Sequence, residues 1–169
     1  VLNILNIKNI SIFYFSYILM AFLVIIIWVI TPFISLIIFL IVASFHFGKE
    51  DTQFLIRENS YLNQILFFLK GLMVILAPMF FHFDETVFIF KLLLVDSETF
   101  YLALNFIETN KILHIGIILS TLASTYLYLK KFEIKKFSIF LDYFSIIILN
   151  YYLSPLVAFT IYFCFLHSI

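Results

Sequence analysis

Long apolar runs separated by short polar segments constrain the fold of this chain more than any other feature. Of its 169 residues, 64% are hydrophobic and only 12% are charged, whereas about a quarter of a typical soluble domain is charged. In hydrocarbon the backbone must satisfy its own hydrogen bonds, and an isolated apolar run does so as a helix. The sequence therefore predicts an all-α, polytopic integral membrane protein.

Six stretches are predicted to be transmembrane helices, because crossing the bilayer takes about 17–25 apolar residues. They are 11–30, 33–48, 64–82, 112–129, 138–153 and 156–169. Thr31-Pro32 and Ser154-Pro155 separate neighbouring stretches, as expected of proline at helix boundaries. We expect one transmembrane domain over 1–169. We also expect a fragment of a longer protein, because the first residue is Val1 and the chain ends within an apolar run.

Segment 84–111 is more polar than its neighbours. It begins with Asp84-Glu85, and its apolar runs, 86–95 and 99–107, are too short to cross singly. We predict two interfacial or re-entrant pieces.

If this segment does not span the membrane, most basic residues fall on one side, and the positive-inside rule makes that side cytoplasmic. That side holds Lys8, Lys49, Arg57, Lys130, Lys131, Lys135 and Lys136, and the other holds Lys91 and Lys111.

The predicted topology sorts the histidines by depth. His46 ends the second apolar stretch and His167 lies near the end of the last, so both are expected at the cytoplasmic end. His82 and His114 flank the opposite interface, where we expect interfacial or structural roles. Because neutral imidazole is the commonest protein metal ligand, His46 and His167 are candidate metal ligands. The alternative for each is a histidine hydrogen-bonded within the structure.

Two carboxylates accompany these histidines. Asp142 is predicted to lie about one turn inside its helix, where a carboxylate usually faces the bundle interior and has a partner. It either orients a metal-bound histidine or pairs with Lys70, which alternatively extends to the interface. Asp51 follows Gly48, a residue that permits a helix to end. Asp51 then either folds back toward the histidines or is a solvated loop charge.

Several functional classes lack support in the sequence. The single cysteine, Cys164, excludes an internal disulfide and any multi-cysteine metal site. The net charge is zero and no basic cluster is interleaved with aromatic residues, so no nucleic-acid partner is expected. There is no glycine-rich phosphate loop, nucleophile elbow or His-Glu-x-x-His motif.

Two segments resemble a known family. The segment 46–51, His-Phe-Gly-Lys-Glu-Asp, resembles the His-Phe-Gly-x-x-Asp segment of the Brp/Blh family of membrane β-carotene 15,15′-dioxygenases. The segment 165–169, Phe-Leu-His-Ser-Ile, resembles the start of that family's Trp-His-Ser-x-Arg-His segment, with Leu166 in place of Trp. The similarity covers the whole chain, and the sequence looks like those of marine bacterial members of the family.

The resemblance implies an Fe(2+) ion held by histidines from several helices, in a multi-pass protein of the bacterial inner (cell) membrane. It implies O2-dependent central cleavage of β-carotene, taken from the lipid phase, into two retinals that supply a microbial rhodopsin. His46 and His167 match two of the family's ligand positions. The remaining ligands are expected outside this chain, so the fragment itself is expected to lack a complete site.

The resemblance also suggests roles for side chains near these histidines. Asp51 and Asp142 are candidates for orienting the metal ligands. The candidates for lining the substrate tunnel are Phe45, Phe47, Phe163 and Phe165. The alternative for the phenylalanines is contact with lipid or the protein core.

Two other functions remain open. Two histidines at one depth on different helices can clamp a haem, as in a membrane cytochrome. A non-enzymatic transporter or assembly subunit is the other alternative, although a transporter places its polar groups near the midplane. Here the polar groups are predicted to gather near one face.

Overall fold

The computed structural model describes the backbone of residues 7–53, 60–94, 98–129 and 137–167, and every element in these ranges is helical. The side chains of residues 7–11, 53 and 167 lie outside the described part as well. The elements are α1 (Ile7–Ile30), α2 (Pro32–Gln53), α3 (Tyr61–Phe81), α4 (Phe83–Leu93), α5 (Glu98–Thr109), α6 (Ile112–Leu129), α7 (Phe137–Tyr152), α8 (Pro155–Ile161) and the π-helix η2 (Tyr162–His167). The predicted all-α class is confirmed.

Each of the six apolar stretches forms helix over most of its described residues, and four helices are long and apolar enough to cross a membrane. These four are Ile12–Ile30, Pro32–Thr52, Tyr61–Phe81 and Ile112–Leu129. The remaining two stretches form shorter apolar helices, Phe137–Tyr152 and Pro155–Leu166. The long helices support a membrane location, and a total of six crossings stays a prediction.

Segment 84–111 forms two short helices, α4 and α5, of 11 and 12 residues. Neither reaches the length of about 17 residues that a single crossing requires. Asp84 and Glu85 lie in the first turn of α4, where carboxylates are favoured by the helix dipole. The Thr86 hydroxyl lies 2.9 Å from the carbonyl oxygen of Pro78 and 2.8 Å from that of His82, across the break between α3 and α4. An interfacial or re-entrant placement of the two pieces stays a prediction.

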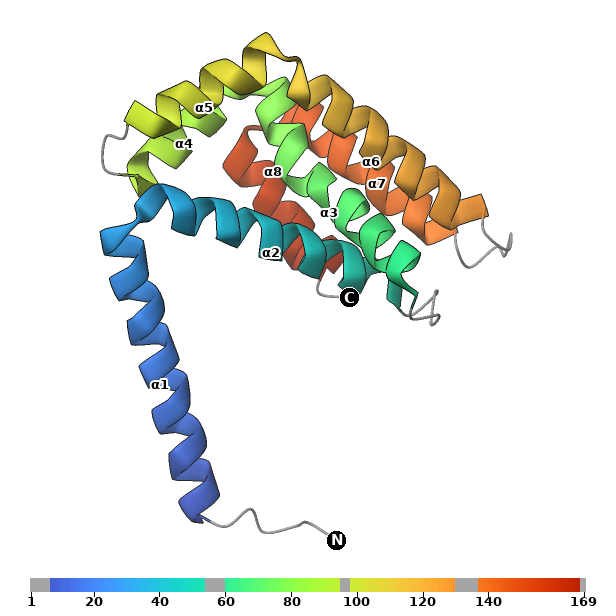
Figure 1. Ribbon diagram of the computed structural model, residues 1–169. Coiled ribbons are helices and arrows are strands. Elements are labelled where there is room, and N and C mark those ends of the chain that lie inside the picture. Colours follow the sequence, from blue (N-terminus) through green and yellow to red (C-terminus); the bar gives the residue numbers. More distant parts are fainter. Residues whose placement is uncertain (1–6, 54–59, 95–97, 130–136, 168–169) are drawn as a thin grey trace, which may run out of the picture.

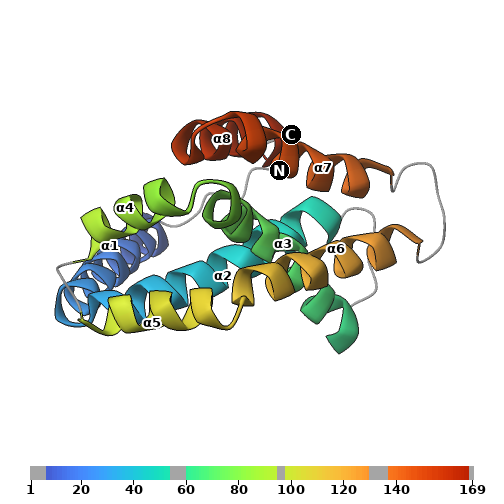
Figure 2. The same cartoon turned by 90° about the horizontal axis from the view of Figure 1, so that it is seen from above.

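The helices form a bundle around α3, with α1 leaning away from it (Figure 1). Figure 2 shows α7 and α8 as a layer over α2, α3 and α6. The most apolar window of α1 buries none of its residues inside the structure. At its C-terminal end, Trp28 Nε1 donates a hydrogen bond of 3.3 Å to the carbonyl oxygen of Leu93. The bundle that carries the candidate site is therefore built by the helices from α2 onward.

The crossing of α2 and α3 is very close, because a glycine from each helix lies at the contact. A Cβ added at Gly48 would overlap the carbonyl oxygen of Phe67, and one added at Gly71 would overlap that of Ser44. Small residues allow such close approach of helices in membranes. The prediction that Gly48 ends its helix is wrong: α2 continues to Gln53, and the glycine serves the crossing.

Candidate functional site

A buried ion pair lies next to this crossing. Lys70 Nζ on α3 is 3.1 Å from Asp51 Oδ2 on α2, and the two side chains are only 2% and 7% exposed. Because α2 continues past Gly48, Asp51 stays on the helix and faces α3. The solvated loop charge predicted as one alternative for Asp51 is therefore wrong. The other alternative, a carboxylate that folds back toward the histidines, stays a prediction, because the structure pairs Asp51 with Lys70. Lys70 does not extend to the interface.

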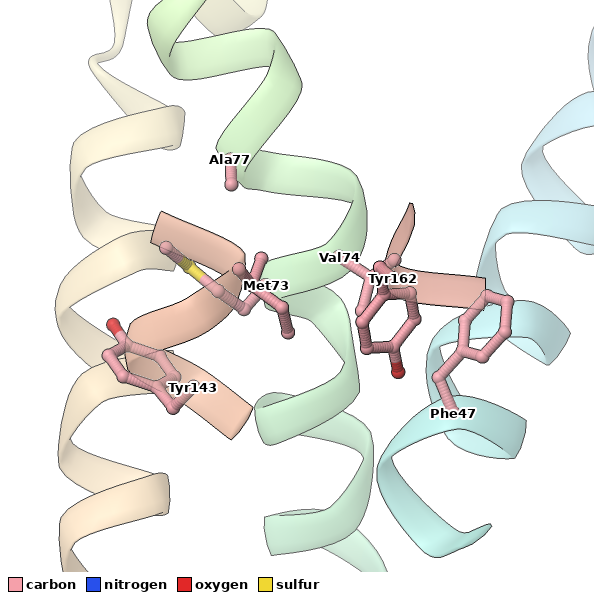
Figure 3. Packing of buried hydrophobic residues seen from close by; sticks show 7 residues of the cluster. Phe47, Met73, Val74, Ala77, Tyr143 and Tyr162 are labelled. Atoms are coloured by element: carbon pink, nitrogen blue, oxygen red, sulfur yellow. The ribbon is translucent and has the colours of Figure 1, made fainter. Parts of the chain in front are cut away.

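Tyr162 connects this ion pair to the last helix. Its Oη donates a hydrogen bond of 2.9 Å to Asp51 Oδ2, and its ring meets that of Phe47 edge-to-face, with centroids 5.7 Å apart. Figure 3 shows the two rings side by side next to Val74 of α3. Tyr162 is 3% exposed and is the first residue of η2. One carboxylate thus joins α2, α3 and η2.

Asp142 on α7 completes a group of charged and hydroxyl side chains that we name the Lys70 cluster: Lys70, Asp51, Tyr162 and Asp142. Asp142 interacts electrostatically with both Lys70 and Asp51. Within the described residues, however, the ion pair of Lys70 is formed with Asp51. The predicted direct pairing of Asp142 with Lys70 is replaced by this longer-range interaction. Charges inside a membrane protein usually face the bundle interior and pair with one another, as Lys70 and Asp51 do.

The two candidate metal ligands lie on elements that contact each other. His46 is an exposed residue of α2, and its ring centroid is 5.9 Å from that of Phe47. His167 is the last residue of η2, and its side chain is outside the described part. Contacts of Tyr162 with Phe47 and Asp51 hold η2 against α2. Convergence of the two imidazole rings stays a prediction.

His82 and His114 lie at a different level of the bundle. Along α3, His82 is eleven residues beyond Gly71, which corresponds to about 16 Å at the rise of an α-helix. The ring centroid of His114 is 5.2 Å from that of Phe80 at the same end of α3. His82 Nε2 is buried and has no hydrogen-bond partner among the described residues. This separation in depth agrees with the predicted sorting of the histidines.

The described side chains do not form a complete metal site. Among them, no group of three or more His, Cys, Asp or Glu residues is arranged to hold an ion. His46 is the one candidate ligand whose side chain is described, and one imidazole does not fit an iron ion by itself. The metal site therefore stays a prediction.

An apolar cavity of about 260 Å³ lies between α2, α3, α4 and α8, and Phe47 forms part of its wall. We name it the Phe47 cavity. Of the other three phenylalanines predicted to line a substrate tunnel, Phe45 is half-buried, with the Lys49 ammonium 5.9 Å from its ring centroid. Phe163 and Phe165 are 49% and 64% exposed. The structure thus separates Phe47 from the other three.

The sequence reasoning identified Asp51, Asp142 and Lys70 but missed Tyr162. A lysine inside an apolar helix is a strong signal in itself, since such a charge needs a partner. Tyr162 carried no comparable signal, because it is one of 10 tyrosines in a chain rich in aromatic residues. Only its contact with Asp51 distinguishes it.

Comparison with known proteins identifies a family for this chain. A family model described as beta-carotene 15,15′-dioxygenase matches residues 1–169. No curated protein matches the chain, and no solved structure does. The family match therefore extends over the same residues that carry the Lys70 cluster, both candidate ligands and the Phe47 cavity.

Proposed function

Because the chain belongs to the beta-carotene 15,15′-dioxygenase family, we propose that it takes part in O2-dependent cleavage of the central double bond of β-carotene. Each of the two carbons of that bond receives one oxygen atom of O2, which gives two molecules of retinal. The single observation that carries the proposal is the family match over all 169 residues. The family name supports a carotenoid dioxygenase. We further propose that the product is retinal, that the metal is iron and that the protein lies in the bacterial inner membrane.

The proposal includes Fe(2+), with His46 and His167 as two of its ligands. Imidazole suits iron(II), and a histidine site can leave positions open. When bound, the metal supplies the activation of O2. Further ligands come from outside the described side chains, because those side chains hold no three-ligand group.

The protein's own residues contribute position and a dry environment. Asp51 binds both Lys70 and Tyr162, and in this way it fixes the start of η2 relative to the helix that carries His46. We propose that Asp51 supports the ligand-bearing helices in this way, and that Asp142 contributes through its electrostatic interaction with Lys70. Because β-carotene is a hydrocarbon that partitions into lipid, an apolar cavity within the bundle is the environment that its chain requires.

The experiment uses the longer protein to which we expect this chain to belong, called the parent protein below, expressed in bacterial cells that make β-carotene. We expect retinal to accumulate, His46→Ala and His167→Ala each to abolish it, and His82→Ala to keep most of it. His82 is the matched control because it is a partly buried histidine at the other level of the bundle. Equal retinal in all three variants would refute the ligand assignment.

A folded parent protein that makes no retinal in these cells would refute the proposed activity. The absorption spectrum of the purified protein separates the activity from the haem alternative. The dioxygenase is expected to show no Soret band, whereas a membrane cytochrome would show one.

A further inference from the structure

We propose that the Phe47 cavity holds one terminal ring of the substrate, a trimethyl-substituted cyclohexene, while the polyene extends out of it past Phe47. This inference rests on the proposed function, because it assigns a place to one part of β-carotene. It goes further by naming which of the apolar cavities takes the substrate and which part of the substrate enters it.

The walls of the cavity select for hydrocarbon. Its lining is aromatic and aliphatic, including Phe39, Phe90 and Phe159. The polar side chain in the lining is Thr86, which is 4% exposed. Its hydroxyl is within hydrogen-bond distance of two backbone carbonyl oxygens. A cavity holds water only where polar partners are available, so this one favours an apolar occupant.

The size of the cavity matches a ring and not a whole carotenoid. An engineered cavity of about 150 Å³ binds benzene, which has six carbons. Scaling by carbon number, the nine carbons of a trimethylcyclohexene ring need roughly 225 Å³. The Phe47 cavity has about 260 Å³, enough for the ring and the first polyene carbons. The rest of a 40-carbon substrate must lie outside it.

The cavity adjoins the helices that carry the candidate ligands. Phe47 is at once a wall of the cavity and the neighbour of His46 on α2. Its ring is also 5.7 Å from that of Tyr162 and 6.1 Å from that of Phe159, centroid to centroid, on the last helices. A chain that leaves the cavity past Phe47 therefore reaches the place where α2 and η2 meet.

A second apolar cavity provides the control. It has about 440 Å³, is lined by residues of α3 and α6, and includes Leu119. It has no wall from α2, so it lacks the link to His46. We therefore compare Leu40→Phe, which fills the Phe47 cavity, with Leu119→Phe, which makes the same change in the second cavity.

The measurement is the amount of carotenoid bound to the parent protein, purified without O2 and with iron chelated, so that binding is read without turnover. The larger side chain at position 40 would occupy part of the space that the ring needs, so we expect Leu40→Phe to lower bound β-carotene about tenfold, which corresponds to about 1.4 kcal/mol. Leu119→Phe should change it less than about twofold. Equal loss in the two variants, or no loss in Leu40→Phe, would overturn the proposal.

An acyclic carotenoid distinguishes a ring from a lipid-like chain as the occupant. Lycopene has the same number of carbons but no rings, so Leu40→Phe should affect its binding much less than that of β-carotene. If both fall equally, the cavity holds a linear chain, as a lipid acyl group would, and the ring assignment is wrong. Should Leu40→Phe fail to fold, Ile75→Phe on the α3 wall makes the same test.

The two proposals fail separately. Unchanged β-carotene binding in Leu40→Phe, in a parent protein that makes retinal, rejects the cavity assignment alone. Selective loss of β-carotene binding, in a parent protein that makes no retinal, supports the cavity and rejects the cleavage activity.

Discussion

Replacing Lys70 by Met removes the one cation of the Lys70 cluster and leaves two carboxylates without it. At 3.1 Å and an effective dielectric constant of about 20, the attraction between Lys70 and Asp51 is about 5 kcal/mol. Desolvation offsets much of this in the intact pair, but breaking a buried pair from one side costs about 3–5 kcal/mol. We therefore expect Lys70→Met to lower the free energy of unfolding by about 3–5 kcal/mol.

The charge-neutral double variant tests the cause of that loss. Lys70→Met combined with Asp51→Asn removes the buried charge pair while the amide oxygen still accepts from Tyr162. A neutral replacement for a buried pair is often tolerated. We therefore expect the free energy of unfolding of the double variant to lie within about 1–2 kcal/mol of the wild-type value. The stability losses of Lys70→Met and Asp51→Asn are then not additive, as is usual for residues in one interaction network.

The assay is reversible unfolding in mixed detergent micelles, followed by circular dichroism. Lys111→Met is the control, because Lys111 is an exposed lysine outside the cluster and such surface changes usually stay within about 0.5 kcal/mol. A loss of less than about 1 kcal/mol in Lys70→Met, or a double variant no more stable than the single, would refute this account of the cluster.

Three further predictions concern the helix contacts and the metal. Tyr162→Phe removes the hydroxyl bonded to a charged carboxylate, so we expect a loss of about 1.5–3 kcal/mol in the same assay; an unchanged stability would show that the bond contributes nothing. Gly48→Ala places a Cβ against the backbone of α3 and should cost more than about 4 kcal/mol. Gly116→Ala is the control, because its added Cβ meets only the end of the Leu76 side chain, at 2.6 Å. We expect it to lower the free energy of unfolding by about 1–3 kcal/mol. Equal losses of stability in the two alanine variants would contradict the close crossing. Removing the metal from the parent protein with a chelator should abolish retinal formation, and added Fe(2+) should restore it. His46→Ala should lower the amount of iron bound per protein molecule. If this variant keeps its full iron content, His46 is not a ligand.

The sequence alone was enough for the helical class and for most helix positions. A backbone in hydrocarbon has to satisfy its own hydrogen bonds, so a run of apolar residues leaves few alternatives to a helix. Segment 84–111 is predicted as two pieces because its two apolar runs are each too short to cross, and it forms α4 and α5. The resemblance in segments 46–51 and 165–169 predicted the family that the comparison then showed.

The tertiary structure decided the partners of Lys70 and Asp51. Hydropathy orders residues by depth, but it does not say which faces of which helices meet. From the sequence, Gly48 is equally consistent with a helix end and with a close helix contact. Only its close approach to Gly71 in the structure shows that it is a helix contact. That choice keeps α2 helical as far as Asp51, turns the carboxylate toward Lys70, and brings it within reach of Tyr162, which is 111 positions away in the chain. Such a pairing depends on the packing of three helices at once, and no single segment of the sequence contains it.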